Sequence, residues 1–215
     1  TAAPETLSAV EIVANLESAI AALALMSALT ITPLPIAAVP LEIVIKVPAE
    51  KVSMVELEPI IDTTNKDTFV KSLNACVDYI YKDLPQSQHI PKEILIAQAA
   101  LETGWGSSRF ANQGNNLFGI RTFNKDSEWL LPVTWDQNKW IGWGVKVYDN
   151  KCDSVKDYIR IINTVFAYEN FREVRENGGD VYELVDTLDK YATKQTYTEL
   201  VKKVIMYNIE GVYEL

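Results

Sequence analysis

The sequence predicts an α+β fold: a mainly helical domain with a small β lobe, preceded by an N-terminal arm of helix and strand. The composition changes along the chain, because all nine glycines lie from Gly104 onward and every aromatic residue lies between Phe69 and Tyr213. Apolar residues recur at helical spacing through most of this second part, whereas residues 117–148 are rich in Gly, Trp and β-branched residues. These shifts divide the chain into an arm, residues 1–62, and a domain, residues 63–215.

In the arm, residues 6–29 are expected to form a helix and residues 41–47 a strand. Prolines interrupt the uncharged run 18–41, so no membrane-spanning helix is expected. An aliphatic segment without aromatic residues is poorly suited to form its own core. This favours an arm that docks on a protein partner or a second copy of the chain. The alternative is a helix and a strand that pack on the domain.

Within the domain, apolar periodicity predicts helices that alternate with one β segment. Pro91 occupies a favoured first-turn position, and Gly104 is expected to end the helix that begins there. Residues 117–148 predict a small antiparallel hairpin. The expected helices span 67–84, 91–102, 153–166, 168–176, 180–190 and 196–207.

Charge and metal-ligating residues exclude several classes of function. The 215 residues carry a formal net charge of −9, whereas nucleic-acid binders need a basic surface to neutralise phosphates. The chain has one histidine, His89, so we expect no histidine-based metal cluster and no cofactor. Two cysteines, Cys76 and Cys152, are too few for a disulfide framework. They form either one bridge or two buried thiols, and we favour the thiols.

The helix over 91–102 carries the strongest chemical signal. Residues 94–101 are all apolar except Gln98, so we expect the helix to be buried on most sides, and its one acid after Glu93 is Glu102 in the last turn. Apolar surroundings and the negative end of the helix dipole both disfavour the ionised carboxylate and raise its pKa. A general acid must hold its proton near neutral pH in this way. The alternative is a glutamate that pairs with Arg109 or caps a turn.

The segment that follows, residues 107–120, is rich in Asn and Gly. Asn side chains both donate and accept hydrogen bonds, which suits hydroxyl and N-acetyl groups. On these residues alone, a cluster of Asx turns that joins the helix to the hairpin is the favoured interpretation.

Several runs of residues together resemble a known family. Residues 99–108, AALETGWGSS, and residues 115–121, NNLFGIR, are similar to the bacterial peptidoglycan β-N-acetylglucosaminidases of glycoside hydrolase family 73. This family includes flagellar rod-associated hydrolases and Bax-like proteins. The resemblance covers about residues 66–208 and none of the arm. Further similar runs follow in the same order and at similar spacing: Tyr148, residues 154–158, residues 170–172, residues 191–193 and Tyr197.

The resemblance implies a lysozyme-like fold with a glycan cleft between the helical lobe and the hairpin. It also implies hydrolysis of the β-1,4 bond after N-acetylglucosamine in the cell-wall polymer. By this resemblance Glu102 matches the catalytic acid and Tyr191 a tyrosine beside the catalytic centre. The residues expected to bind substrate on the same ground are Asn115, Asn116, Phe118, Gly119 and Tyr197.

Glycoside hydrolysis usually needs a second carboxylate as base or nucleophile. In the resembled family that residue, where present, lies on the β-hairpin, where this chain has Asp126, Glu128 and Asp136. We favour Glu128, beside Trp129, followed by Asp136. Alternatively, all three are solvated loop charges, and the substrate's own 2-acetamido oxygen attacks the anomeric carbon. Tyr191 would then orient the acetyl group or a water.

Five tryptophans lie between positions 105 and 143. Sugars present apolar C–H faces that stack on aromatic rings, so we expect Trp105 and Trp129 to bind substrate in the cleft. The alternative is that the tryptophans cover the thin β lobe as a small core.

The sequence thus favours an enzyme that cleaves peptidoglycan strands and is held in a larger assembly by its arm. No basic segment typical of an export signal precedes the apolar stretch. We therefore expect a mature extracellular or periplasmic protein, or a component of a phage particle or secretion machine. Two alternatives stay open: a non-catalytic lysozyme-like module with a structural or glycan-binding role, and a lytic transglycosylase, which also relies on one acid.

Overall fold

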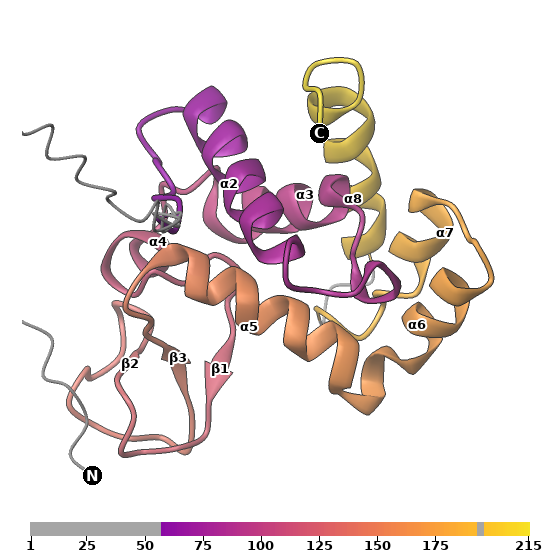
Figure 1. Cartoon of the computed structure of the whole chain (residues 1–215). Coiled ribbons are helices and arrows are strands. Elements are labelled where there is room, and N and C mark those ends of the chain that lie inside the picture. Colours follow the sequence, from indigo (N-terminus) through magenta and orange to yellow (C-terminus); the bar gives the residue numbers. More distant parts are fainter. Residues whose placement is uncertain (1–56, 193–195) are drawn as a thin grey trace, which may run out of the picture. The chain divides into compact units, whose positions relative to one another are not determined.

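A computed structural model describes residues 57–192 and 196–215 of the chain (Figure 1). The helix expected over 6–29 and the strand expected over 41–47 lie outside these residues, and the boundary at residue 62 stays a prediction. In the described part the α+β class is confirmed, because helices surround one core and a small antiparallel sheet lies beside them. No helix of this part is long and apolar enough to cross a membrane.

Helix α3 (Lys92–Thr103) is the centre of the helical lobe and packs against α2 (Lys66–Tyr81) and α8 (Tyr197–Val204). Most of its side chains are buried, as its apolar sequence predicts. Helix α2 begins at the capping box of Asn65. It ends at Tyr81, three residues before the predicted end, since Pro85 restricts the residue before it. Two short helices flank α3: η2 (Gln86–Gln88) and α4 (Arg109–Gln113).

A disulfide joins Cys76 of α2 to Cys152 of α5 (Lys151–Thr164), with the two Cα atoms 5.9 Å apart. The prediction of two buried thiols is therefore wrong. Both cysteines lie on the buried faces of their helices, and these helices pack on each other. Their separation of 76 positions in the sequence gave no sign of this proximity, which arises only in the tertiary fold.

The β lobe consists of three very short antiparallel strands rather than one hairpin. Strands β1 (Arg121–Thr122) and β2 (Trp129–Leu130) both pair with β3 (Gly144–Lys146), so that the order is β1-β3-β2. Val145 is the central position, opposite Arg121 on one side and Leu130 on the other. Figure 1 shows the lobe below the N-terminal end of α5.

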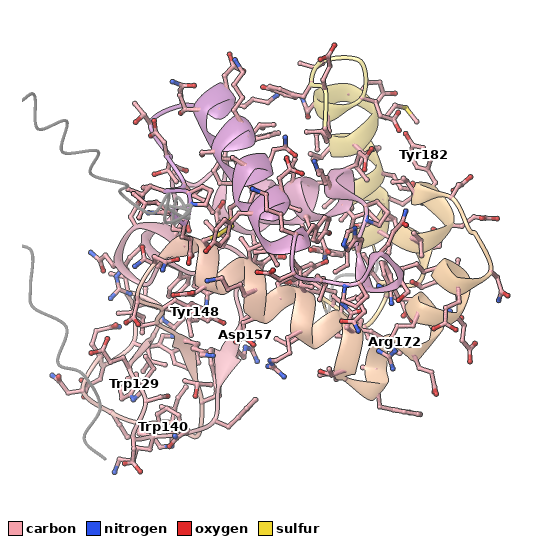
Figure 2. The ribbon with its side chains drawn as sticks, viewed as in Figure 1. Trp129, Trp140, Tyr148, Asp157, Arg172 and Tyr182 are labelled. Atoms are coloured by element: carbon pink, nitrogen blue, oxygen red, sulfur yellow. A yellow bond between two sulfur atoms is a disulfide. The ribbon has the colours of Figure 1, made fainter. Side chains whose placement is uncertain are left out.

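Asp157 of α5 fastens this lobe to the helices (Figure 2). Its Oδ2 accepts hydrogen bonds from Lys146 Nζ at 2.7 Å and from the Tyr148 hydroxyl at 2.8 Å. Its Oδ1 accepts two from the Arg160 guanidinium. Burial alone would raise the pKa of Asp157, but these hydrogen bonds outweigh it and hold the pKa below its ordinary value. The lobe therefore depends on an ionised carboxylate.

The C-terminal half closes the helical lobe. Phe171 of α6 (Glu169–Glu176) is buried, and Arg172 of α6 donates to the carbonyl oxygens of Ile162 and Val165 where α5 ends. The helix predicted over 180–190 is much shorter than expected, because the chain leaves it to form a turn that lines the site. The elements are η3 (Phe166–Tyr168), α6 (Glu169–Glu176), α7 (Val181–Asp186), α8 and a π-helical turn, η4 (Ile205–Ile209).

Candidate functional site

The end of α3 positions the carboxyl group of Glu102. Gly104 adopts a left-handed conformation with φ of 57° and caps the helix two residues later. Trp105 and Gly106 continue the left-handed turn, and a Cβ at Gly106 would come within 2.5 Å of Thr63 Cγ2. This tight turn takes the chain away from the axis of α3 directly after Thr103. Glu102 is thus an exposed residue in the last turn of a mostly buried helix.

Glu102 opens into a cavity of about 1060 Å³. One side is formed by residues 118–121 and Phe123, which lead into the β lobe. The other side is formed by side chains of α5 and η3 and by residues 189–192. A cavity of this size between the two lobes is large enough for several sugar rings, because typical ligand pockets measure roughly 300–1,000 Å³.

Gly119 gives the carboxyl group of Glu102 its open space. Its φ of 64° lies in the left-handed region, and a Cβ built there would be 3.4 Å from Glu102 Oε2. Any side chain at this position would stand against the carboxylate. Glycine therefore both permits the turn and keeps Glu102 accessible.

Two opposing influences set the pKa of Glu102. Partial burial removes hydration from the carboxylate and raises its pKa, and a hydrogen bond from the Tyr197 hydroxyl lowers it in part. The Tyr197 hydroxyl also accepts a hydrogen bond from Gln98 Nε2 at 3.0 Å, and Gln98 Oε1 accepts one from the Tyr158 hydroxyl. Because the amide nitrogen can only donate, the Tyr197 hydrogen is left for Glu102. The net result is a pKa of Glu102 above its ordinary value.

Stacked aromatic rings form the wall beside Glu102. The Tyr191 hydroxyl donates to the Phe118 carbonyl oxygen at 2.7 Å, and its ring stacks on Tyr197 with centroids 5.6 Å apart. Phe118 in turn stacks on Tyr158 with centroids 4.2 Å apart. Burial raises the pKa of Tyr191 well above its ordinary value, so its hydroxyl stays neutral. The structure thus brings together four residues expected from the sequence, namely Glu102, Phe118, Gly119 and Tyr191, with Tyr197 directly behind them.

Asn116 lies beneath the site as a scaffold residue. It is fully buried, and its amide nitrogen donates to the carbonyl oxygens of Ile120 and Lys146, 2.9 and 2.8 Å away. Its amide oxygen accepts from the backbone nitrogens of Phe118 and Ile120. All four hydrogen bonds of the amide are therefore used in shaping the loop around Gly119 and joining it to β3.

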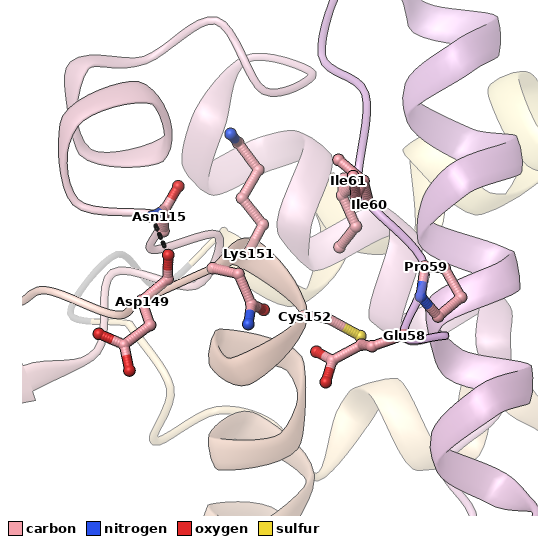
Figure 3. Close-up of a pocket in the computed structure, with 9 residues that line it drawn as sticks. Glu58, Pro59, Ile60, Ile61, Asn115, Asp149, Lys151 and Cys152 are labelled. Atoms are coloured by element: carbon pink, nitrogen blue, oxygen red, sulfur yellow. Dashed lines mark hydrogen bonds between the residues drawn. The ribbon is translucent and has the colours of Figure 1, made fainter. Parts of the chain in front are cut away.

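Asn115 lies at a different, smaller pocket of about 240 Å³ beside the start of α5 (Figure 3). Its amide nitrogen donates to the carbonyl oxygens of Tyr148 and Asp149. Among the described residues, Asn115 is therefore not part of the wall around Glu102.

The two tryptophans expected in the cleft are not among the residues that line the large cavity. Trp105 packs edge-on against Phe69, with Lys66 Nζ 4.3 Å from its ring centroid. Trp129 contacts Trp140, with centroids 5.3 Å apart, and its side chain lies close against Gly144 (Figure 2). In this structure both rings contribute to local packing.

The three acids of the β lobe are all exposed, and none lines the large cavity. Asp126 and Asp136 take part in local turns, through Asn124 and Asn138 respectively. Glu128 receives a backbone hydrogen bond at its carbonyl oxygen from Val147. A second carboxylate within the cavity wall is instead Asp189, whose Oδ2 is 2.8 Å from Lys190 Nζ.

Sequence reasoning did not single out the other lining residues, among them Arg121, Phe123, Ile161, Asp189 and Lys190. The sequence held a signal for Arg121 and Phe123. They are two positions apart, as residues on one side of a strand are, and they directly follow the glycine-bearing run. Over the described residues, no group of three or more His, Cys, Asp or Glu side chains is placed to hold a metal ion.

Comparison with known proteins places this geometry in a family. The Glucosaminidase family model, described as mannosyl-glycoprotein endo-β-N-acetylglucosaminidase, matches residues 79–210. Peptidoglycan hydrolase FlgJ of Vibrio parahaemolyticus is 30% identical over 148 residues, which are 64% of this chain and 46% of FlgJ. Exo-glucosaminidase LytG of Bacillus subtilis is 26% identical over 147 residues, 65% of this chain and 50% of LytG. The chain thus spans about half the length of the curated relatives it matches.

Among solved structures, the catalytic domain of the autolysin Auto from Listeria monocytogenes matches with a TM-score of 0.50 at 21% identity. The match covers 96% of this chain and 98% of that domain and confirms the predicted lysozyme-like fold. The family model matches well over half of the chain and includes Glu102 and the aromatic wall. The chain therefore belongs to the glucosaminidase family, glycoside hydrolase family 73.

Proposed function

We propose that this chain hydrolyses the β-1,4 bond after N-acetylglucosamine in the glycan strands of bacterial peptidoglycan, with Glu102 as the general acid. The observation that carries the proposal is the carboxyl group of Glu102, which has a raised pKa and opens into a cavity between two lobes. Membership of the glucosaminidase family and the peptidoglycan hydrolase FlgJ among its relatives support the substrate class.

In the proposed step, Glu102 donates its proton to the bridging oxygen while the bond between that oxygen and the anomeric carbon breaks. The raised pKa favours the protonated form that this step requires. Tyr197 donates a hydrogen bond to the carboxylate that remains. We propose that Tyr191, on the cavity wall, orients the N-acetyl group or a water.

The group that stabilises or attacks the anomeric carbon is a separate part of the proposal. Glu128 stays our predicted second carboxylate, with Asp136 next, although neither lines the cavity. The alternative needs no second acid, because the 2-acetamido oxygen of the substrate attacks the anomeric carbon. If Glu128→Gln retains parental activity, attack by the 2-acetamido oxygen is favoured. If the activity falls as far as in Glu102→Gln, Glu128 is favoured as the second carboxylate.

The test of the proposed function compares Glu102→Gln with Glu93→Gln, a control in the first turn of the same helix. Loss of a general acid lowers the rate by roughly 10²–10⁴-fold. We therefore expect Glu102→Gln to lose wall-lysis activity by this factor and Glu93→Gln to keep it. Equal lysis by the parent and Glu102→Gln would remove the catalytic assignment. Absence of lysis by the parent would favour a non-catalytic glycan-binding module.

Mass spectrometry of the products separates hydrolysis from lytic transglycosylation. Hydrolysis leaves a reducing N-acetylglucosamine end, whereas transglycosylation leaves an anhydro-muramic end. We expect the reducing end. Anhydro products would keep Glu102 as the acid but overturn the assigned reaction.

We propose that the protein acts in the cell envelope. The disulfide between Cys76 and Cys152 supports this location, because such bonds persist in oxidising compartments. The name of FlgJ as a peptidoglycan hydrolase supports it as well.

We further propose that residues 1–62 dock the enzyme in a larger assembly, as an oligomer or in a phage particle or envelope machine. The support is the aliphatic composition of this segment. Light scattering of the full chain should give more than the monomer mass of 24.1 kDa, and Leu16→Glu with Ile20→Glu should reduce it to that mass. A monomeric parent would contradict self-association.

A further inference from the structure

Strand β1 and the residue that follows it supply two lining residues on the β-lobe side of the cavity that have no role in the proposed step. Arg121 and Phe123 both line the cavity, whereas Thr122 between them does not. The Thr122 hydroxyl instead lies 2.9 Å from that of Ser127 within the lobe. This alternation is the ordinary consequence of strand geometry, which sends every second side chain to the same side. Arg121 and Phe123 therefore share one wall.

Phe123 is a large apolar side chain left open to water, with 75% of its surface exposed. Exposure alone indicates little, because Phe166 is 80% exposed and does not line the cavity. Phe123 differs by its position on the wall of a cavity that also holds Glu102. A flat apolar ring at that place suits the C–H face of a pyranose.

Arg121 lines the same cavity wall as Phe123, and its guanidinium is available to bind a ligand. Its guanidinium carbon lies 4.1 Å from the ring centroid of Trp143, which is backed in turn by Trp135. In the described part of the chain it forms no ion pair, whereas the other lining cation, Lys190, pairs with Asp189. A guanidinium packed over an aromatic ring still offers N–H groups that can bind a carboxylate.

We infer that Arg121 and Phe123 form a sugar subsite for a ring of the glycan that carries an acidic substituent. Phe123 stacks on the sugar face, and Arg121 binds the carboxylate of that substituent. This inference rests on the proposed function, because the peptidoglycan strand supplies such a carboxylate on the lactyl group or on the attached peptide. The subsite would make the enzyme select peptidoglycan over neutral glycans such as chitin oligomers.

The test measures binding by calorimetry in the Glu102→Gln background, so that turnover does not consume the ligand. Three ligands are compared: a chitin hexasaccharide, peptidoglycan strands stripped of peptide, and peptide-bearing strands. Phe123→Ala should weaken the binding of all three about 10-fold, with Phe166→Ala as the matched control. Arg121→Gln should weaken only the acidic strands, also about 10-fold, with Lys139→Gln as a control that removes one charge from the same lobe.

The ligands also identify the source of the carboxylate. An effect of Arg121→Gln on stripped strands assigns the lactyl group, and an effect confined to peptide-bearing strands assigns the peptide. Unchanged binding in Phe123→Ala, or an equal loss for the chitin hexasaccharide in Arg121→Gln, would overturn the subsite. That outcome leaves the proposed function intact if the parent still lyses walls. A parent that neither binds nor cuts the strands would remove both proposals.

Discussion

The disulfide between α2 and α5 is expected to supply much of the domain's stability. It closes a loop of 76 positions, and in the chain-entropy model a loop of that length contributes about 4.5 kcal/mol at 25 °C. Measured values for native disulfides are typically about 2–5 kcal/mol, so the expected loss on reduction lies between about 2 and 4.5 kcal/mol. For a domain of this size that corresponds to a decrease in Tm of roughly 5–15 °C.

The assay is urea unfolding of the oxidised and the reduced parent, followed by tyrosine and tryptophan fluorescence. Comparing two redox states of one sequence isolates the bond, because both sulfur atoms stay in place. The variant Cys76→Ala in the oxidised state is the second measurement, and it should be at least as unstable as the reduced parent, since it also leaves a small cavity. A difference below about 1 kcal/mol between the two redox states would refute the reasoning.

The remaining predictions concern the site and its support. Gly119→Ala should lower activity and cost only about 1 kcal/mol of stability, because the new methyl group stands against Glu102 Oε2 and the backbone there is left-handed; kinetics and thermal melts separate the two effects. Tyr197→Phe should shift the alkaline limb of the kcat/KM profile to higher pH, because the lost hydrogen bond had lowered the pKa of Glu102; a shift to lower pH would contradict this. Asn116→Ala should destabilise the domain by about 3 kcal/mol in urea unfolding, since four hydrogen bonds are lost. The stabilising contribution of Asp157 should be complete above the ordinary pKa of 3.8 and disappear as pH falls through its lower folded value, whereas Asp157→Asn should lack this dependence.

The helical lobe and its acid were predictable because their signals are local. The apolar run over residues 94–101 predicts the burial of α3, Gly104 marks its end, and Glu102 is the one acid of its last turn. The same reasoning was less accurate for helix ends, since α7 ends at Asp186 rather than at residue 190. Short irregular elements carried less information, so the β lobe was expected as a hairpin but has a third strand.

Features that depend on tertiary packing escaped sequence reasoning. The proximity of Cys76 and Cys152 follows from how α2 packs on α5, and the apolar pattern of neither helix reveals this packing. One signal for the bridge was available: the family resemblance implies an enzyme that acts outside the cytosol, where disulfides persist. Asp189 lies in a turn after α7, where residue type alone does not distinguish a cavity wall from solvent.

The bridge and the acid are connected through α5. Helix α5 begins beside the disulfide, carries the Asp157 anchor of the β lobe, and contributes Tyr158 to the wall and to the hydrogen bond with Gln98. A displacement of α5 would therefore disturb both the distance between the lobes and the tyrosine pair behind Glu102. Because one helix supports both walls of the cavity, reduction should lower activity at temperatures where the helical content is still intact. A parent whose activity and unfolding curves coincide after reduction would show instead that the domain fails only as a whole.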